Sequence, residues 1–243
     1  MLLSEMLDYT AKEFLDDRTT LVDGDPDSLY SDSFLVRMFN HAQRILARRS
    51  WCIIEYGVAP AGIITLRTGV ALYPVNKAVL KVFDSTPSTM SSPLGRSDDI
   101  VLRSDTPHDD YDAFEVGEAA ALASTETGAP RAMASDAGSR LVRVYPTPTA
   151  TENGVQMALK IARLPLIELT LDNVDAEPEV PSQWHEDLCH YAAGRALTLP
   201  NVDAQMKTDG RLLLAEFAEV VKEARRDRVR FGLGTSRWAF SSS

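Results

Sequence analysis

Two patterns of hydrophobic and polar positions divide this chain. In the first fifty residues, and again after residue 178, apolar positions recur every three or four residues, which is the period of an amphipathic helix. Between residues 51 and 178 the period changes to two, which is typical of half-buried strands. The pattern therefore predicts helical segments over 1–50 and 179–228, with a β-rich insertion over 51–178.

Four helices are expected in the two helical segments. They run over about 4–17, 32–49 and 182–199, and from Asp203 or Asp209 to 228. Pro200 ends the third helix, and Gly210 leaves the start of the fourth open because glycine disfavours helix. After residue 228 the period is lost, so we expect residues 229–243 to form an extended C-terminal tail.

Short alternating segments fill the middle of the chain. They are "WCIIEYG", "GIITLRT", "AVLKVFD", "DIVLR", "RLVRVYP" and "VQMALKIA". Residues 104–139 are rich in Ala, Ser, Thr, Asp and Gly, which predicts a long, partly mobile loop, with a short helix at "EVGEAAALAS". Because strands follow one another without helices between them, we expect an antiparallel sheet. The fold class is α+β: terminal helices packed as a bundle, an inserted β-sandwich or barrel-like region, and the tail.

Composition excludes some functions. The 243 residues carry a formal net charge of -10, which argues against a protein that grips nucleic acid by its phosphates. Two cysteines are too few for a disulfide framework and indicate a reducing compartment. The opening "MLLSEMLDYT" lacks the basic region of a secretory signal, and no apolar run is long enough for a membrane span. We therefore expect a protein made in the cytoplasm and not bound to membrane.

The stretch "PSQWHEDLCHYAAGRAL", residues 181–197, contains the residue types of a metal-dependent hydrolase. His185 and His190 are five residues apart, so on a helix they point roughly 140° away from each other and do not share a metal. His185 and Cys189 have the required spacing, with Glu186 beside them, but they need a third ligand. The residues that could supply it are His41, His108 and Cys52.

A structural helix explains the same stretch more simply. Ser182 is the expected N-cap, and Glu186 and Asp187 favour the first turn. The expected buried stripe consists of Trp184, Leu188, Tyr191, Ala192 and the stem of Arg195. The acidic "DGDPDSLYSDSF" lacks the Gly and Glu that a calcium loop requires, and "FGLGTS" does not follow a strand. We therefore expect no catalytic, metal-binding or cofactor-binding residues.

Basic and aromatic residues gather near the C-terminus. The cluster "KEARRDRVR", residues 222–230, fits a solvated helix end, whose dipole favours cations. It also fits a docking arm, because aromatic and Arg side chains on a flexible segment are favoured anchors in a partner's groove. The candidate anchors are Arg228, Arg230, Phe231, Arg237, Trp238 and Phe240. The alternative of an unimportant, disordered end stays open.

Three stretches together resemble a known family. These are "ALYPVNKAVLKVFD" (71–84), "LVRVYPTPTATENGVQMALKIARLP" (141–165) and "EVPSQWHEDLCHYAAGRALTLPNVDAQ" (179–205). They are similar to the head-to-tail adaptor (connector) proteins of tailed bacteriophages, although Pro74 directly follows Tyr73, which departs from the family spacing. The positions that match the C-terminal signature are Pro181, Trp184, His185, Glu186, Tyr191, Ala192 and Ala193.

The resemblance implies a non-enzymatic structural role in the virion. Copies would form a ring, usually a dodecamer, beneath the portal protein at the neck. The ring would lengthen the DNA channel and offer a platform to tail nozzle or tail tube proteins. Genomic DNA would pass without sequence-specific binding, and residues 229–243 would dock on the portal. Two alternatives remain: another ring-forming neck component, such as a tail terminator or nozzle subunit, and the metal-dependent hydrolase.

Overall fold

The structure is a computed structural model that describes residues 1–15, 30–88, 126–130, 132–136, 140–200 and 202–232. Contacts between Cα atoms divide the chain into two units. The helical unit consists of Met1–Ile53 and Leu164–Ser243, and the β unit consists of Ile54–Arg163. The expected mixture of helices and antiparallel sheets is confirmed, and the strands described do not close into a barrel.

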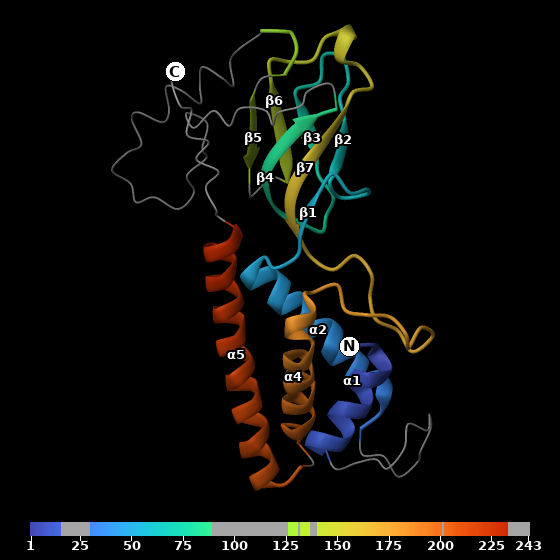
Figure 1. The fold of residues 1–243 in the computed structure, drawn as a ribbon, viewed down its shortest axis with the longest axis vertical. Helices are drawn as coiled ribbons and strands as arrows, with labels where there is room; N and C mark the ends of the chain where they lie inside the picture. The colour runs from blue at the N-terminus through green and yellow to red at the C-terminus, as the bar shows by residue number, and fades with distance from the viewer. Residues whose placement is uncertain (16–29, 89–125, 131, 137–139, 201, 233–243) are drawn as a thin grey trace, which may run out of the picture. The chain divides into compact units, whose positions relative to one another are not determined.

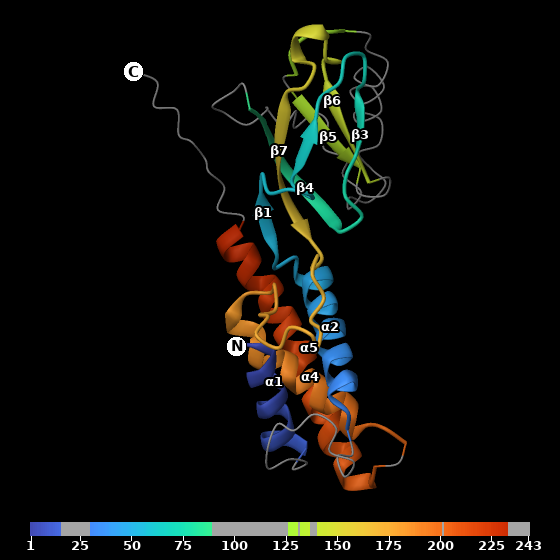
Figure 2. The same cartoon turned by 90° about the vertical axis from the view of Figure 1, so that its right-hand side faces the viewer.

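Helix α4 is the central element of the helical unit. The helices are α1 (Leu3–Thr10, continued by a π-helical turn, Ala11–Leu15), α2 (Asp32–Ser50), α4 (His185–Leu197) and α5 (Ala204–Gly232). α4 packs against the other three, with α5 on one side and α1 on the other (Figures 1 and 2). Its small and apolar side chains are buried in the core of this unit, among them Leu188, Cys189, Ala192, Ala193 and Ala196.

Two glycines set the close packing of α4 on α5. A Cβ atom at Gly194 would lie 2.9 Å from the Gly210 carbonyl oxygen, and one at Gly210 would lie 2.8 Å from the Leu197 Cβ. Gly210 therefore belongs inside α5, although its helix propensity is poor. The helix begins directly after Asp203, whose carboxylate accepts a hydrogen bond from the Met206 N–H at 2.9 Å. Of the two starts considered, Asp203 was right.

Several helix boundaries differ from the predictions. The first helix changes to a π-helical turn at Ala11, and α5 continues to Gly232, past the expected end at 228. Ser182 is not an N-cap, because Ser182–Trp184 form a 3-10 turn (η5) that leads into α4. Arg195 is exposed rather than part of the buried stripe, because Gly194 and Ala196 face the core beside it.

The β unit contains two antiparallel sheets. In the first, β7 (Gln156–Arg163) pairs with β1 (Ile54–Tyr56), β2 (Ile63–Thr65) and β4 (Val79–Pro87). In the second, β6 (Leu141–Tyr145) lies between β3 (Leu72–Pro74) and β5 (Ala132–Asp136). Both sheets contribute to one hydrophobic core, which includes Met133, Val142, Val144, Met157, Leu159 and Ile161. Alternating burial along β6 and β7 matches the period of two in the sequence.

Strand β5 corrects the prediction of a continuous loop over 104–139. Residues 132–136 pair with β6 from Ala132↔Tyr145 to Asp136↔Leu141, and Met133 is buried in the core. The small residues around Met133 concealed the strand, because Ala and Ser have weak strand propensity. The expected strand "DIVLR" and the expected short helix "EVGEAAALAS" lie outside the described residues.

Candidate functional site

The described part of the chain holds no group of three or more His, Cys, Asp or Glu side chains that could bind a metal ion. His185, the main candidate ligand, is 2% exposed. Its Nδ1 lies 2.8 Å from the terminal ammonium nitrogen of Met1, and its Nε2 lies 2.9 Å from the Val180 carbonyl oxygen. The ammonium donates to Nδ1, so Nε2–H donates to Val180, and no ring nitrogen is left for a metal. Burial lowers the pKa of the imidazole, which favours this neutral form.

The neighbours of His185 also have structural roles. Burial raises the pKa of the Cys189 thiol to about 12, and its Sγ contacts the Met6 carbonyl oxygen at 3.8 Å. A thiol of this kind is neither a nucleophile nor a ready metal ligand. Glu186 accepts a hydrogen bond of 2.6 Å from the Tyr9 hydroxyl, which raises the pKa of Tyr9 to about 12. His185, Glu186 and Cys189 therefore connect α4 to α1 and to the residues before α4.

The remaining residues of the family signature lie on α4 and just before it. Tyr191 is buried against Phe217, and its hydroxyl lies 2.8 Å from the His41 Nδ1. Trp184, Ala192 and Ala193 are buried in the same core, whereas Pro181 is exposed. The signature is thus placed where α1, α2, α4 and α5 meet, which is the position of a folding determinant.

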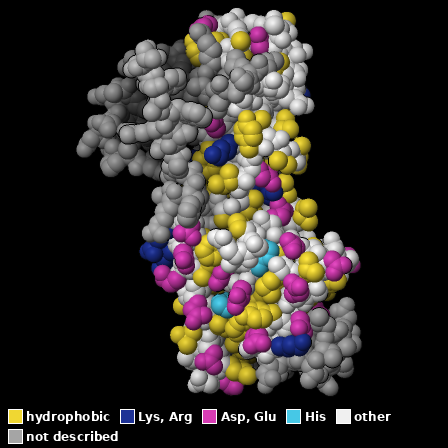
Figure 3. Space-filling view, in the orientation of Figure 1, with side chains coloured by type: hydrophobic (Ala, Val, Ile, Leu, Met, Phe, Trp, Pro, Cys, Tyr) yellow, Lys and Arg dark blue, Asp and Glu magenta, His cyan; other side chains and the backbone are white. Residues whose placement is uncertain are grey.

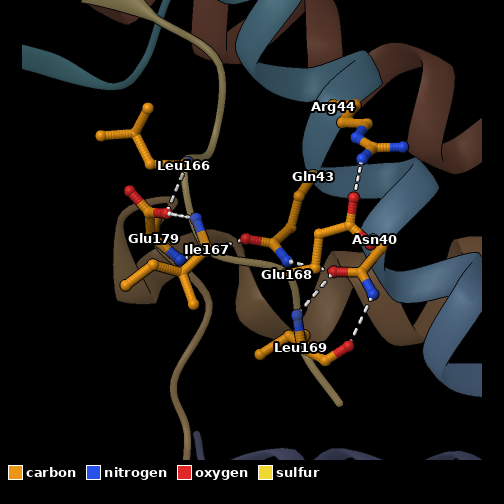
Figure 4. Close-up of polar contacts among 8 residues, drawn as sticks. All are labelled: Asn40, Gln43, Arg44, Leu166, Ile167, Glu168, Leu169 and Glu179. Carbon is orange, nitrogen blue, oxygen red and sulfur yellow. Dashed lines mark hydrogen bonds and ion pairs between the residues drawn. The ribbon is translucent and has the colours of Figure 1, made fainter. Parts of the chain in front are cut away.

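A different part of the helical unit forms a surface suited to contact with a partner. Residues 164–180 connect β7 to η5 without helix or strand, and we call them the anchored segment. The Asn40 side chain on α2 bonds twice to its backbone: Leu169 N–H donates to Asn40 Oδ1, and Asn40 Nδ2 donates to the Leu169 carbonyl, both at 2.9 Å (Figure 4). This pairing imitates one rung of a sheet and fixes Leu169, which is 4% exposed, against α2.

Further side chains hold the two ends of the anchored segment together. One oxygen of Glu179, Oε1, accepts from Leu166 N–H at 2.7 Å and from Ile167 N–H at 2.6 Å, and Glu179 N–H donates to Gln43 Oε1 at 3.1 Å (Figure 4). Gln43 lies on α2 and is only 1% exposed. Arg44, one residue further on, pairs with Glu168.

This anchoring presents apolar side chains to solvent. Ile167 is 71% exposed and Leu166 is 37% exposed, and we call these two residues the apolar ridge. A flexible loop would turn such side chains away from water, but the hydrogen bonds to Asn40, Gln43 and Glu179 fix the backbone beneath them. Exposed apolar groups on a preorganised backbone lose little conformational entropy on binding, so the ridge is a good contact point.

The segment around the ridge is strongly acidic. Residues 164–180 contain five carboxylates and no Lys or Arg. Asp172, Asp175 and Glu177 are exposed, and no ion-pair partner of theirs lies within the described residues. A partner that lies against this part of the segment must therefore tolerate negative charge.

The candidate docking residues near the C-terminus cannot be placed in this surface. Arg228, Arg230 and Phe231 belong to the last turns of α5, but their side chains are not described. Arg237, Trp238 and Phe240 lie outside the described residues. The structure thus leaves their role as a prediction.

Sequence reasoning missed the anchored segment and its anchors. One signal was available: Gln43 stands between Ala42 and Leu46 on the apolar side of a helix, and a buried amide requires partners. The partners themselves, 129 to 136 residues away in the sequence, could not be inferred from the pattern.

Within the described residues, no helix has both the length and the apolar character needed to cross a lipid bilayer.

A fixed, exposed apolar ridge favours contact with a partner. The sequence matches the family model described as SU10 adaptor protein over residues 1–237. The chain therefore belongs to this family of bacteriophage head-to-tail adaptors, which confirms the resemblance found in the sequence. Membership makes it a structural protein of the virion neck. No curated protein matches the chain.

Proposed function

We propose that copies of this chain form a ring, a dodecamer, beneath the portal protein of a tailed bacteriophage. The ring lengthens the channel through which DNA passes and offers a platform to tail nozzle or tail tube proteins. Assembly takes place in the host cytoplasm. The observation that carries this proposal is the family match over residues 1–237. The apolar ridge supports it, because a monomer gains nothing from holding Ile167 in water.

The charge of the chain supports a channel function. A formal net charge of -10 disfavours tight binding to phosphates, so DNA can slide through a ring of such subunits without being held. No sequence-specific contact with DNA is part of the proposal. The pattern of side chains in the described residues, with His185 and Cys189 buried in the core, also supports a role without catalysis.

We assign the portal contact to the C-terminal residues. Arg228, Arg230, Phe231, Arg237, Trp238 and Phe240 combine cationic and aromatic groups, which are favoured anchors in interfaces. Because α5 extends to Gly232, deletion of residues 233–243 removes no residue of the described fold. We expect this deletion to abolish binding to the portal protein of the same phage, measured by sedimentation or native mass spectrometry.

A smaller change tests the same contact. The triple variant R237A/W238A/F240A should bind portal at least tenfold more weakly, since loss of about 1.4 kcal/mol corresponds to a factor of ten. The matched control changes Ser241, Ser242 and Ser243 to alanine and should bind as the wild type does. Portal binding that survives deletion of residues 233–243 would remove the docking role of this segment.

A further inference from the structure

The exposed surface of α5 separates its charges by sign. Between residues 204 and 227 the helix has five acidic and five basic residues, so its formal charge is zero. Around the helix axis, at about 100° per residue, the acidic side chains fall within a sector of roughly 80°. The basic side chains fall within a neighbouring sector of roughly 100°. The acidic flank consists of Asp209, Glu216, Glu219, Glu223 and Asp227. The basic flank consists of Lys207, Arg211, Lys222, Arg225 and Arg226.

The buried stripe of α5 lies between the two flanks. Gly210, Phe217, Val221 and Ala224 are buried and fix how the helix is turned. Both flanks therefore face outward, and they meet along the outermost line of the helix, where Lys222 contacts Glu219. Only one ion pair within the described residues joins the flanks, Lys222 to Glu219 at 2.6 Å, and both of its side chains are well exposed. Such surface pairs contribute little to stability, so intrahelical pairing does not explain the separation.

Helix α4 continues the acidic flank. Glu186 and Asp187 lie in its first turn, and Glu223 of α5 is close enough to help raise the pKa of Asp187, after burial as the main cause. Figure 3 shows the resulting surface: Asp and Glu side chains are spread over this face of the helical unit, and Lys and Arg side chains are few on it. We call it the acidic face. Leu212 of α5 is exposed among these carboxylates and adds an apolar contact.

Helix α2 carries the opposite charge. Arg37, Arg48 and Arg49 are exposed on it, and Arg44, which is also exposed, pairs with Glu168 of the anchored segment. The one acidic residue of α2, Asp32, is buried. α2 lies behind α4 in the view of Figure 1, as the side view of Figure 2 shows, so its exposed side points away from the acidic face. With the basic flank of α5, these residues form what we call the basic face.

We infer that the acidic face of one copy of this chain binds the basic face of the next copy. A contact between two different faces is heterologous, and its repetition closes into a ring when the rotation permits. A monomer has no use for such a separation, whereas complementary faces steer association and reject misaligned neighbours. This inference rests on the proposed ring, and it specifies the surfaces that hold the ring together.

Charge reversal tests the inference. The residues chosen have no hydrogen-bonded or ion-paired partner within the described part of the chain: Glu216 and Glu223 on the acidic face, and Arg211 and Arg225 on the basic face. Variant E216K/E223K and variant R211E/R225E should each remain folded but require at least roughly tenfold more protein to assemble on the portal, because like charges then meet. The quadruple variant carries both changes, so opposite charges meet again and assembly should return.

Two further samples complete the experiment. The control K77E/K160E changes two exposed lysines of the β unit, makes the same change in net charge as R211E/R225E and should assemble normally. A mixture of the two double variants should co-assemble, because each supplies the face that the other needs. The readout is the mass of the portal-bound complex by native mass spectrometry, with circular dichroism to confirm folding.

The outcomes separate the inference from the proposed function. If the wild-type protein does not assemble on the portal, the proposed ring is wrong and the inference falls with it. If the wild type forms a ring and both double variants form it equally well, only the inference is wrong. A quadruple variant that stays unassembled while folded also contradicts it, since complementarity is then not the cause.

Discussion

Replacement of Asn40 by alanine removes the main attachment of the anchored segment to α2. The Asn40 amide exchanges two hydrogen bonds of 2.9 Å with the backbone of Leu169, and alanine can make neither of them. Leu169 is 4% exposed, so water reaches its N–H and C=O only if the segment moves. The variant N40A therefore leaves two buried backbone groups without partners or releases the segment.

The expected loss of stability follows from these contacts. Each buried polar group left without a partner costs about 1–3 kcal/mol, and solvent that enters the vacated space holds the cost at roughly 1.5 kcal/mol for each of the two groups. Alanine is a better helix former than asparagine by roughly 0.5 kcal/mol, which offsets part of the loss. We expect N40A to lower the free energy of unfolding of the helical unit by about 2–3 kcal/mol.

Urea unfolding and hydrogen exchange measure this effect. The unfolding midpoint should fall, and the Leu169 amide should exchange roughly 30- to 150-fold faster, because 1.4 kcal/mol corresponds to a factor of ten. The matched control N173A changes an exposed asparagine of the same segment, for which no side-chain hydrogen bond is formed within the described residues, and should stay within about 0.5 kcal/mol of wild type. A Leu169 amide as protected in N40A as in wild type would refute the reasoning.

Three other variants test separate parts of the structure. Gly194→Ala should destabilise the α4–α5 contact by about 1–2 kcal/mol in thermal unfolding despite better helix propensity, since its Cβ would meet a carbonyl oxygen at 2.9 Å. Tyr73→Phe should lower the stability of the β unit by about 1–2 kcal/mol, because the hydroxyl accepts from Arg67 N–H at 2.9 Å and donates to the Val70 carbonyl at 2.7 Å. Because the pKa of His185 is lowered in the folded state, the unfolded chain binds a proton at this imidazole more readily than the folded chain does. The contribution of His185 to the free energy of unfolding is therefore complete above pH ~6.5 and is lost as the pH falls below it. Urea titrations at pH 7.5 and 5.5 measure the free energy of unfolding. In the wild type His185 should lower it by up to about 1.4 kcal/mol per pH unit as the pH falls, and the variant His185→Gln should lack this contribution. An unchanged pH dependence in the variant would contradict the neutral, buried imidazole.

Helices were predictable from the sequence where one face is apolar and the ends carry strong signals. α2 begins after Ser31, whose carbonyl and hydroxyl oxygens both accept a hydrogen bond from the Phe34 N–H. It ends at Ser50, before Trp51, whose backbone is in the left-handed conformation. α4 was recognised by its apolar stripe, but the 3-10 turn over Ser182–Trp184 was not, because a helical pattern does not distinguish the two hydrogen-bonding schemes. The end of α5 was misjudged because Phe231 and Gly232 are poor helix formers that nevertheless continue the helix.

The candidate site was less predictable than the fold. Helical spacing argued against a metal shared by His185 and His190, but it left the pair of His185 and Cys189 open. The apolar ridge could not be found in the same way, because Leu166 and Ile167 read as ordinary core residues when their backbone is unknown. Their exposure depends on the distant partners Gln43 and Glu179, which no local pattern connects.

Imaging of the neck of the intact virion by cryo-electron microscopy tests the central claim most directly. The account predicts a ring of identical subunits of this chain, twelve in number, in contact with the portal, with α5 of each subunit at the boundary with its neighbour. A neck in which this chain is present as isolated copies, or is missing beneath the portal, would contradict the account.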